Sequence, residues 1–109
     1  MIVMITSCGS VDEADRIASA LVEDRLAACV QIVPATSVYR WRGTVERAAE
    51  HVLHIKTRAE FADAVEARVR ALHSYDLPEL IVLPVAGGSA EYLAWVRAET
   101  AGAGTKPSS

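Results

Sequence analysis

The sequence has no cluster of basic residues and no long apolar run, and it contains only two cysteines. Each of these scarcities excludes a class of protein. Proteins that bind nucleic acid usually present a positive stripe to the phosphates. A chain of formal net charge −3 without such a stripe is therefore expected to have no nucleic-acid partner.

The apolar run at the start, residues 1–5, is much shorter than a signal-peptide core or a membrane-spanning helix. Cys8 and Cys29 are too few for a disulfide framework. We therefore expect no membrane partner and a reducing, cytoplasmic location. The sequence also lacks a Ser/His/Asp grouping, a Walker loop and a dinucleotide fingerprint, so we expect a protein that is not an enzyme.

What is present is a strongly patterned chain of 109 residues, 51% of them hydrophobic. This length suits one domain, which we expect over residues 1–100. The tail, residues 101–109 (AGAGTKPSS), is small and polar and is expected to be disordered.

The hydrophobic periodicity alternates between strand and helix. Two S/T-x-x-E patterns, Ser10–Glu13 and Thr57–Glu60, predict helix starts with capping boxes. The expected elements are strands over 1–7, 27–42, 44–58 and 79–85, and helices over 11–25, 61–72 and from 90 onward. The first and last of these strands are short apolar runs and are expected to be buried. The order β-α-β-β-α-β plus a terminal helix predicts an α+β, ferredoxin-like fold, an antiparallel sheet with two helices on one face.

The second and third strands form an unusually long hairpin, Ala27–Arg58, turning at Gly43. Arms of roughly a dozen residues span about 40 Å, whereas a compact chain of this size has a radius of gyration near 13 Å. One subunit cannot cover such a hairpin, so a second copy is expected to do so. Pro34 predicts an edge position, a bulge or a bend. Residues 46–50 are expected near the tip or in solvent, and 52–56 at the base.

The loop after the second predicted helix gathers an imidazole, a phenol and two carboxylates: His73, Tyr75, Asp76 and Glu79. Such groups suit a borderline divalent metal such as Cu(II) or Zn(II). The alternative is structural, with His73 at the C-terminus of its helix and Glu79 in an ion pair.

Cys8 follows the first predicted strand near a helix start, where it is either a metal ligand, a reactive thiol or a small turn residue. Cys29 is expected in the core. His51 and His54, three apart in a strand, are expected on opposite faces, where they cannot share one ion.

Five separated segments of the chain closely resemble the CutA family of divalent-cation tolerance proteins. They are Leu26–Val30 (LAACV), Ser37–Trp41 (SVYRW), Ile55–Thr57 (IKT), Leu77–Ile81 (LPELI) and Tyr92–Trp95 (YLAW). The resemblance implies a ferredoxin-like subunit, a tight homotrimer with strands paired between subunits, and a non-catalytic role linked to copper and other divalent cations.

The resemblance also implies a metal site formed by a cysteine near the end of the first strand and a His-His pair after the second helix. Alignment through Leu26–Cys29 puts Thr6 at the cysteine position, with Cys8 two residues later, and Leu72 at the first histidine. The candidate ligands in this chain are therefore His73, Glu79 and Cys8.

Two other functions fit the sequence. The first is a trimeric small-molecule-sensing module, in which Tyr75, Arg40, Lys56 and Glu79 line a cleft between subunits and bind an anionic metabolite. The second is a very stable scaffold without a ligand, held together by the apolar surface buried between subunits.

Overall fold

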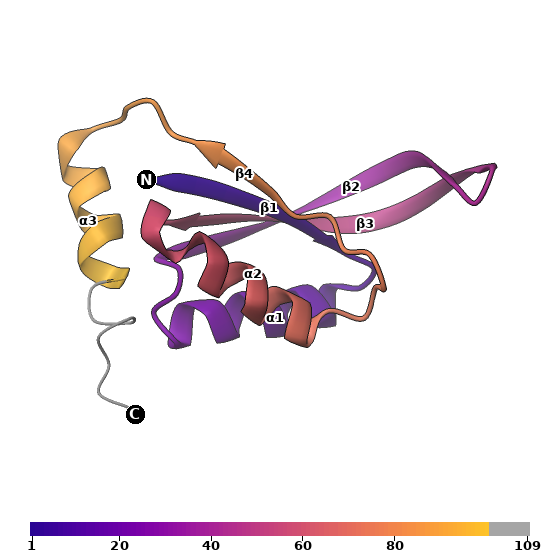
Figure 1. Ribbon diagram of the computed structural model, residues 1–109, viewed down its shortest axis with the longest axis horizontal. Coiled ribbons are helices and arrows are strands. Elements are labelled where there is room, and N and C mark those ends of the chain that lie inside the picture. Colours follow the sequence, from indigo (N-terminus) through magenta and orange to yellow (C-terminus); the bar gives the residue numbers. More distant parts are fainter. Residues whose placement is uncertain (101–109) are drawn as a thin grey trace.

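The computed structural model describes residues 1–100, and the expected disordered tail lies outside that range. The described chain has four strands, three α-helices and one short 3-10 helix (Figure 1). In chain order they are β1 (Ile2–Cys8), α1 (Val11–Glu23), β2 (Cys29–Trp41), β3 (Thr44–Thr57), η1 (Ala59–Phe61), α2 (Ala62–Leu72), β4 (Ile81–Pro84) and α3 (Ala90–Thr100).

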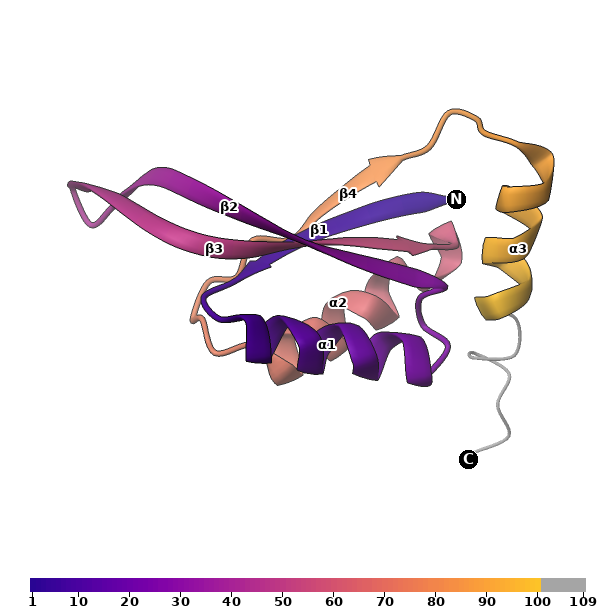
Figure 2. The same ribbon diagram turned by 180° about the vertical axis from the view of Figure 1, so that it is seen from behind.

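The four strands form one antiparallel sheet in the order β2-β3-β1-β4. Helices α1 and α2 lie together on one face of it, as both views show (Figures 1 and 2). The core between the two layers contains Met4, Ile17, Leu53, Val65 and Val69, each at most 1% exposed. This arrangement confirms the predicted ferredoxin-like α+β fold. None of the helices within residues 1–100 is both long and apolar enough to span a membrane.

The β2–β3 hairpin turns through Arg42 and Gly43, and the last ladder pair is Trp41 with Thr44. Both turn residues have positive φ, 51° and 83°, as a two-residue type I′ turn requires. The turn at Gly43 is therefore confirmed. The left-handed backbone at Arg42 has no signal in the sequence.

The hairpin is longer than the strand beside it. Strand β1 ends at Cys8, which pairs with His51. The seven hairpin pairs nearer the turn, from Ala35–Glu50 to Trp41–Thr44, therefore have no third strand beside them. The hairpin projects beyond the rest of the fold, away from α3 (Figure 1), and the chain measures 45 × 32 × 21 Å. Pro34 lies in β2 at the edge of the sheet, which confirms one of the three positions expected for it.

The two predicted capping boxes have different outcomes. At α1, the hydroxyl of Ser10 accepts a hydrogen bond of 3.2 Å from the backbone N–H of Glu13, so the predicted cap is present. At the second box the cap residue is Arg58 and no side chain caps the helix, so this prediction is wrong. The hydroxyl of Thr57 instead donates a 2.6 Å bond to the carbonyl of Leu26, because Thr57 is still the last residue of β3.

Three burial predictions are also wrong. Strand β4 was expected to be buried, but Ile81, Val82 and Leu83 are each 44–46% exposed at the sheet edge. Cys29 is half-buried because it opens β2, the other edge strand. Glu50 was expected near the tip or in solvent and is 8% exposed, because the loop before β4 covers it.

Candidate functional site

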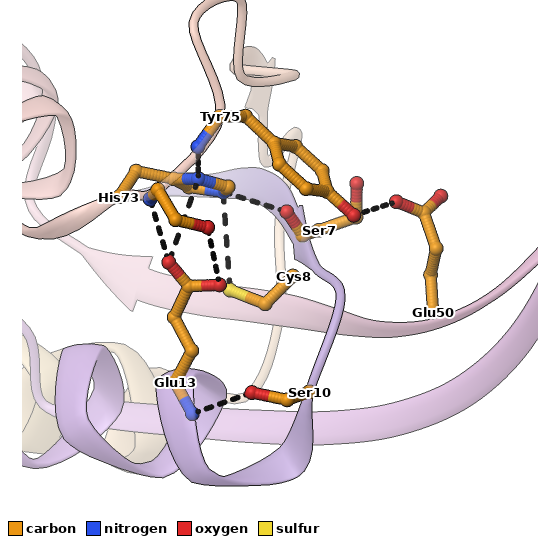
Figure 3. Close-up of polar contacts among 8 residues, drawn as sticks. Ser7, Cys8, Ser10, Glu13, Glu50, His73 and Tyr75 are labelled. Atoms are coloured by element: carbon orange, nitrogen blue, oxygen red, sulfur yellow. Dashed lines mark hydrogen bonds and ion pairs between the residues drawn. The ribbon is translucent and has the colours of Figure 1, made fainter.

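The loop from His73 to Leu80 passes beside the end of β1, next to the first turn of α1 (Figure 3). His73 is the C-cap of α2, and its N–H still bonds the carbonyl of Val69 at 2.9 Å. Its backbone is extended, with φ −83° and ψ 141°, so the chain leaves the helix axis there. The extended backbone at the end of α2 therefore directs this loop toward β1.

The imidazole of His73 is buried and both of its nitrogens have partners. Its side chain is 1% exposed. Nε2 lies 2.7 Å from the carbonyl oxygen of Ser7, and Nδ1 accepts the backbone N–H of Tyr75 at 3.1 Å. A nitrogen that faces a carbonyl must donate, and one that faces an N–H must accept. His73 is therefore a neutral imidazole with its proton on Nε2.

Glu13 is a buried carboxylate that fixes the same loop. It accepts the backbone N–H of Ser74 at 2.6 Å and the hydroxyl of Ser74 at 3.1 Å. Its Oε2 also lies 3.9 Å from Nδ1 of His73. In a complete capping box this side chain would turn back to its own helix start. Here the Glu13 side chain instead links α1 to the loop. The spacing of residues in the sequence gives no indication of this role.

Cys8 lies against the same imidazole. Its Sγ is 3.9 Å from Nε2 of His73, and the residue is fully buried (Figure 3). Burial raises the pKa of the Cys8 thiol to about 11, with a smaller contribution from the charge of Glu13. At neutral pH the thiol keeps its proton, which argues against the reactive-thiol interpretation. Thr6 lies two residues before Cys8 on the same face of β1 and is fully buried. Cys8, and not Thr6, is therefore the residue beside His73.

A groove of about 600 Å³ lies on the other side of β1, between the hairpin and the loop. Across it the hydroxyl of Tyr75 donates a 2.9 Å hydrogen bond to Oε2 of Glu50. Burial, and then this bond, raise the pKa of the Tyr75 phenol to about 12. Glu79 lines the same groove and accepts a 3.4 Å bond from the hydroxyl of Ser7.

Gly9 lets Tyr75 reach this position. A Cβ at residue 9 would lie 3.0 Å from the phenol oxygen, closer than about nine in ten real Cβ contacts. Because β1 has just ended, Tyr75 can occupy the place beside β3 that a longer first strand would fill. The groove therefore depends on the short β1, the long hairpin and the missing side chain at residue 9.

The three predicted metal ligands are only partly brought together. Cys8 and His73 are in contact, but Glu79 binds Ser7, whose side chain points to the opposite face of β1 from that of Cys8. Within residues 1–100, no three His, Cys, Asp or Glu side chains are grouped closely enough to hold a metal ion. His51 and His54 do lie on opposite faces, as their separation by three in β3 requires.

The four residues predicted for an anion cleft are separated within the subunit. Tyr75 and Glu79 line the groove, but a guanidinium nitrogen of Arg40 lies 3.5 Å from the carbonyl of Gly43 at the hairpin tip. The amine of Lys56 lies 5.7 Å from the Tyr92 ring centroid. On β3, Lys56 is six residues from Glu50, or about 20 Å along the strand.

The sequence pattern of the CutA1 divalent ion tolerance protein family matches residues 2–99. The chain belongs to this family. It is 48% identical over 99 residues to the divalent-cation tolerance protein CutA of Thermus thermophilus, covering 90% of this chain and 96% of the relative. It is 43% identical over 100 residues to the chloroplastic protein CutA 1 of rice, covering 91% of this chain and 56% of that longer protein.

Solved structures of CutA proteins have the same fold. The periplasmic divalent cation tolerance protein CutA of Archaeoglobus fulgidus superposes with a TM-score of 0.89 at 38% identity, covering 92% of this chain and 99% of the other. The PII-like protein CutA of Nostoc sp. PCC 7120, in apo form, gives a TM-score of 0.87 at 34% identity, with 92% and 97% covered. The CutA family membership expected from the five sequence segments is confirmed.

Proposed function

We propose that this CutA-family chain acts in divalent-cation tolerance as a non-catalytic, cytoplasmic homotrimer that binds Cu(II) or another divalent ion. The observation that carries the metal proposal is the contact between Cys8 and His73, a sulfur and a nitrogen donor on adjacent elements. Soft and borderline donors of this kind favour copper or zinc over magnesium or calcium.

The spacing of the two donors suits one bridging ion. Metal–sulfur and metal–nitrogen bonds of about 2.3 and 2.0 Å sum to about 4.3 Å, and the observed sulfur–nitrogen distance is 3.9 Å. Both donors carry a proton in the metal-free protein. On ion binding the thiol of Cys8 would release its proton, and the imidazole proton of His73 would move from Nε2 to Nδ1. Glu79 is the proposed carboxylate ligand, and loss of its bond to Ser7 would accompany that role.

Calorimetric titration with Cu(II) tests this site. We expect His73→Ala and Cys8→Ser each to weaken binding by about tenfold or more, and wild-type affinity to rise with pH between about 6 and 8. The matched controls are His51→Ala and Cys29→Ser, which remove the same donor types elsewhere and are expected to leave the isotherm unchanged. If the site variants and the controls gave the same isotherm as wild type, the metal would have to bind at another site.

The trimer proposal is supported by surface that one subunit leaves uncovered. Within residues 1–100 both edges of the sheet, β2 and β4, are unpaired. Large apolar side chains are exposed along both, including Val33, Val38, Ile81, Val82 and Leu83. Native mass spectrometry should give three times the chain mass, and a monomer at micromolar concentration would contradict the proposal.

The cytoplasmic proposal is supported by the two cysteines, which are both free thiols. The Archaeoglobus neighbour carries the word periplasmic in its name, so location needs a direct measurement. Fractionation of the source cells, with detection of this chain, should recover it with cytoplasmic markers. Recovery with periplasmic or extracellular markers would overturn this part of the proposal.

The anion-sensing alternative has less support from the geometry. Arg40 and Lys56, its two basic residues, lie away from the groove that Tyr75 and Glu79 line. A thermal-shift screen of nucleotides and organic acids against divalent metals separates the two functions, because a ligand that binds the folded state raises the melting temperature.

A further inference from the structure

A small cavity, separate from the groove, lies at the end of the fold away from the hairpin. Its volume is about 170 Å³, and it is lined by the segment after β4, by one face of α3 and by Arg58. Figure 1 shows α3 at this end, beside the first residues of β1 and the start of α2. None of the lining residues belongs to β2, β3 or β4. The cavity therefore lies outside the hairpin and the strand edges that further copies are expected to cover.

Arg58 is the central charged group of this cavity, and its guanidinium is held in place by its neighbours. Nε donates a 2.9 Å hydrogen bond to the hydroxyl of Thr100, and Nη2 donates to the carbonyl of Arg97. The guanidinium carbon lies 5.0 Å from the centroid of the Phe61 ring. Because these contacts fix the orientation of the guanidinium, little side-chain entropy remains to be lost when a ligand binds to it.

The positive charge of Arg58 lacks a carboxylate partner. Within residues 1–100 it forms no ion pair with Asp or Glu, and the N–H groups on its Nη1 have no acceptor there. The second guanidinium of the cavity, that of Arg97, is already neutralised by Glu60, which accepts hydrogen bonds from both terminal nitrogens at 3.1 Å. No Asp or Glu among the described residues lines the cavity. A half-buried cation of this kind is best satisfied by an anion from outside the subunit.

The remaining wall supplies backbone donors and an apolar surface. The N–H groups of Ala86 and Gly87 have no acceptor in the described part of the chain. Val85, Leu93 and Val96 line the cavity with hydrocarbon, and Val96 is only 1% exposed. At about 30 Å³ for each water-sized group, the cavity has room for a molecule of about six non-hydrogen atoms. Its occupant should therefore be small, anionic at one end and apolar at the other.

We propose that this cavity binds a short aliphatic carboxylate, with its oxygens at Nη1 of Arg58 and its hydrocarbon end against α3. A guanidinium matches the two oxygens of a carboxylate. An inorganic phosphate would gain less, because much of the wall is apolar and only one guanidinium is free of a counter-charge. Cys8 and His73 lie at the opposite end of β1, since the cavity is lined by Met1 and Cys8 is the last residue of that strand. The site therefore goes beyond the proposed metal function and does not depend on it.

Titration of the full chain with sodium butyrate, in the assembly that it forms in solution, tests this site. Chemical shifts in NMR spectra locate the ligand, and butyramide, of the same shape without the charge, is the matched ligand control. We expect butyrate to shift the Nε–H signal of Arg58 and the methyl signals of Leu93 and Val96, beyond any effect of equal sodium chloride. Butyramide should bind at least about tenfold more weakly. Equal affinities would overturn the proposal, as would unshifted signals at about 100 mM butyrate, which fills a site of millimolar Kd.

Two variants test the role of the guanidinium groups. Arg58→Gln should weaken butyrate binding by about tenfold or more, because it removes the unpaired cation. Arg97→Gln should weaken it by about threefold, since it removes an exposed positive charge and leaves Glu60 without its partner. This second variant keeps the test valid if Arg58→Gln fails to fold. Arg70→Gln, exposed on α2 and outside the cavity, is the control with no expected effect. Wild-type butyrate affinity in whichever cavity variants fold would refute the site.

Discussion

The hydroxyl of Tyr75 donates a 2.9 Å hydrogen bond to Glu50 and so joins the loop after α2 to the hairpin beyond the end of β1. The two residues are 25 apart in sequence, Glu50 in strand β3 and Tyr75 in the loop between α2 and β4. Since Glu50 is buried with this one donor, the bond holds together both walls of the groove.

Tyr75→Phe should lower the free energy of unfolding by about 1–2 kcal/mol, because it leaves a buried carboxylate without its donor. Tyr92→Phe is the control, since its hydroxyl has no hydrogen bond within the described residues, and should change stability by less than about 0.5 kcal/mol. Urea unfolding of the two variants measures the difference. Equal free energies of unfolding for the two variants would mean that water replaces the Tyr75 hydroxyl at Glu50 without a loss of stability.

Gly9→Ala should destabilise the protein by about 1–2 kcal/mol, because the new methyl group would lie 3.0 Å from the phenol oxygen. In the Tyr75→Phe background that oxygen is absent and the next ring atoms are 3.7 Å away. We therefore expect Gly9→Ala to lower the free energy of unfolding by less in the Tyr75→Phe background than in wild type, the difference being about 0.5 kcal/mol or more. Strict additivity of the two changes would contradict the close contact. Gly87→Ala, with open space around residue 87, is the control.

Glu13→Ala should destabilise the protein by about 1–3 kcal/mol, since the backbone N–H and hydroxyl of Ser74 lose their acceptor. Asp15→Ala, exposed on the same helix, is the matched control. Hydrogen exchange at the Ser74 amide gives a local readout and should become faster in Glu13→Ala only. An unchanged exchange rate would show that Glu13 does not anchor the loop.

Alkaline pH should destabilise the protein through Cys8. Burial raises its pKa from 9.0 to about 11 in the folded chain, so the folded state holds this proton more tightly. The stabilisation is complete below pH 9 and is lost as pH rises toward 11, by about 3 kcal/mol in total. Urea unfolding at pH 8 and 10.5 should show this loss in wild type and a smaller one in Cys8→Ser. The phenol of Tyr75, raised to about 12, adds a loss above pH 10 in both proteins.

The sheet, its helices and the hairpin turn could be predicted because their signals are local. Alternating or continuous apolar runs mark the strands, the repeat Val65 and Val69 marks α2, and Gly43 marks the turn. Burial was harder to predict. Ile81 and Leu83 have the composition of a central strand, but the topology puts β4 at an edge, where the rest of the described chain leaves it exposed.

The candidate site was predicted in part. The loop was recognised from His73 and Glu79, and the structural role considered for His73, at the end of α2, is the one observed. Glu13 and Glu50 were missed, because their partners are 61 and 25 residues away and no spacing rule connects them. The sequence also gives no sign that β1 stops before the hairpin does, and that difference in length opens the groove.

The tight turn at Arg42 and Gly43 also has a consequence for the order of folding. Strands β2 and β3 are joined by two residues, whereas β1 and β4 meet across most of the chain, with Ile2 opposite Pro84. Local hairpins form within microseconds, and pairings of high sequence separation are slower. We expect pulse-labelled hydrogen exchange to protect the amides of β3 before those of β4. The segment that shapes the finished surface would then be the first part of the sheet to form, and the edge strand the last.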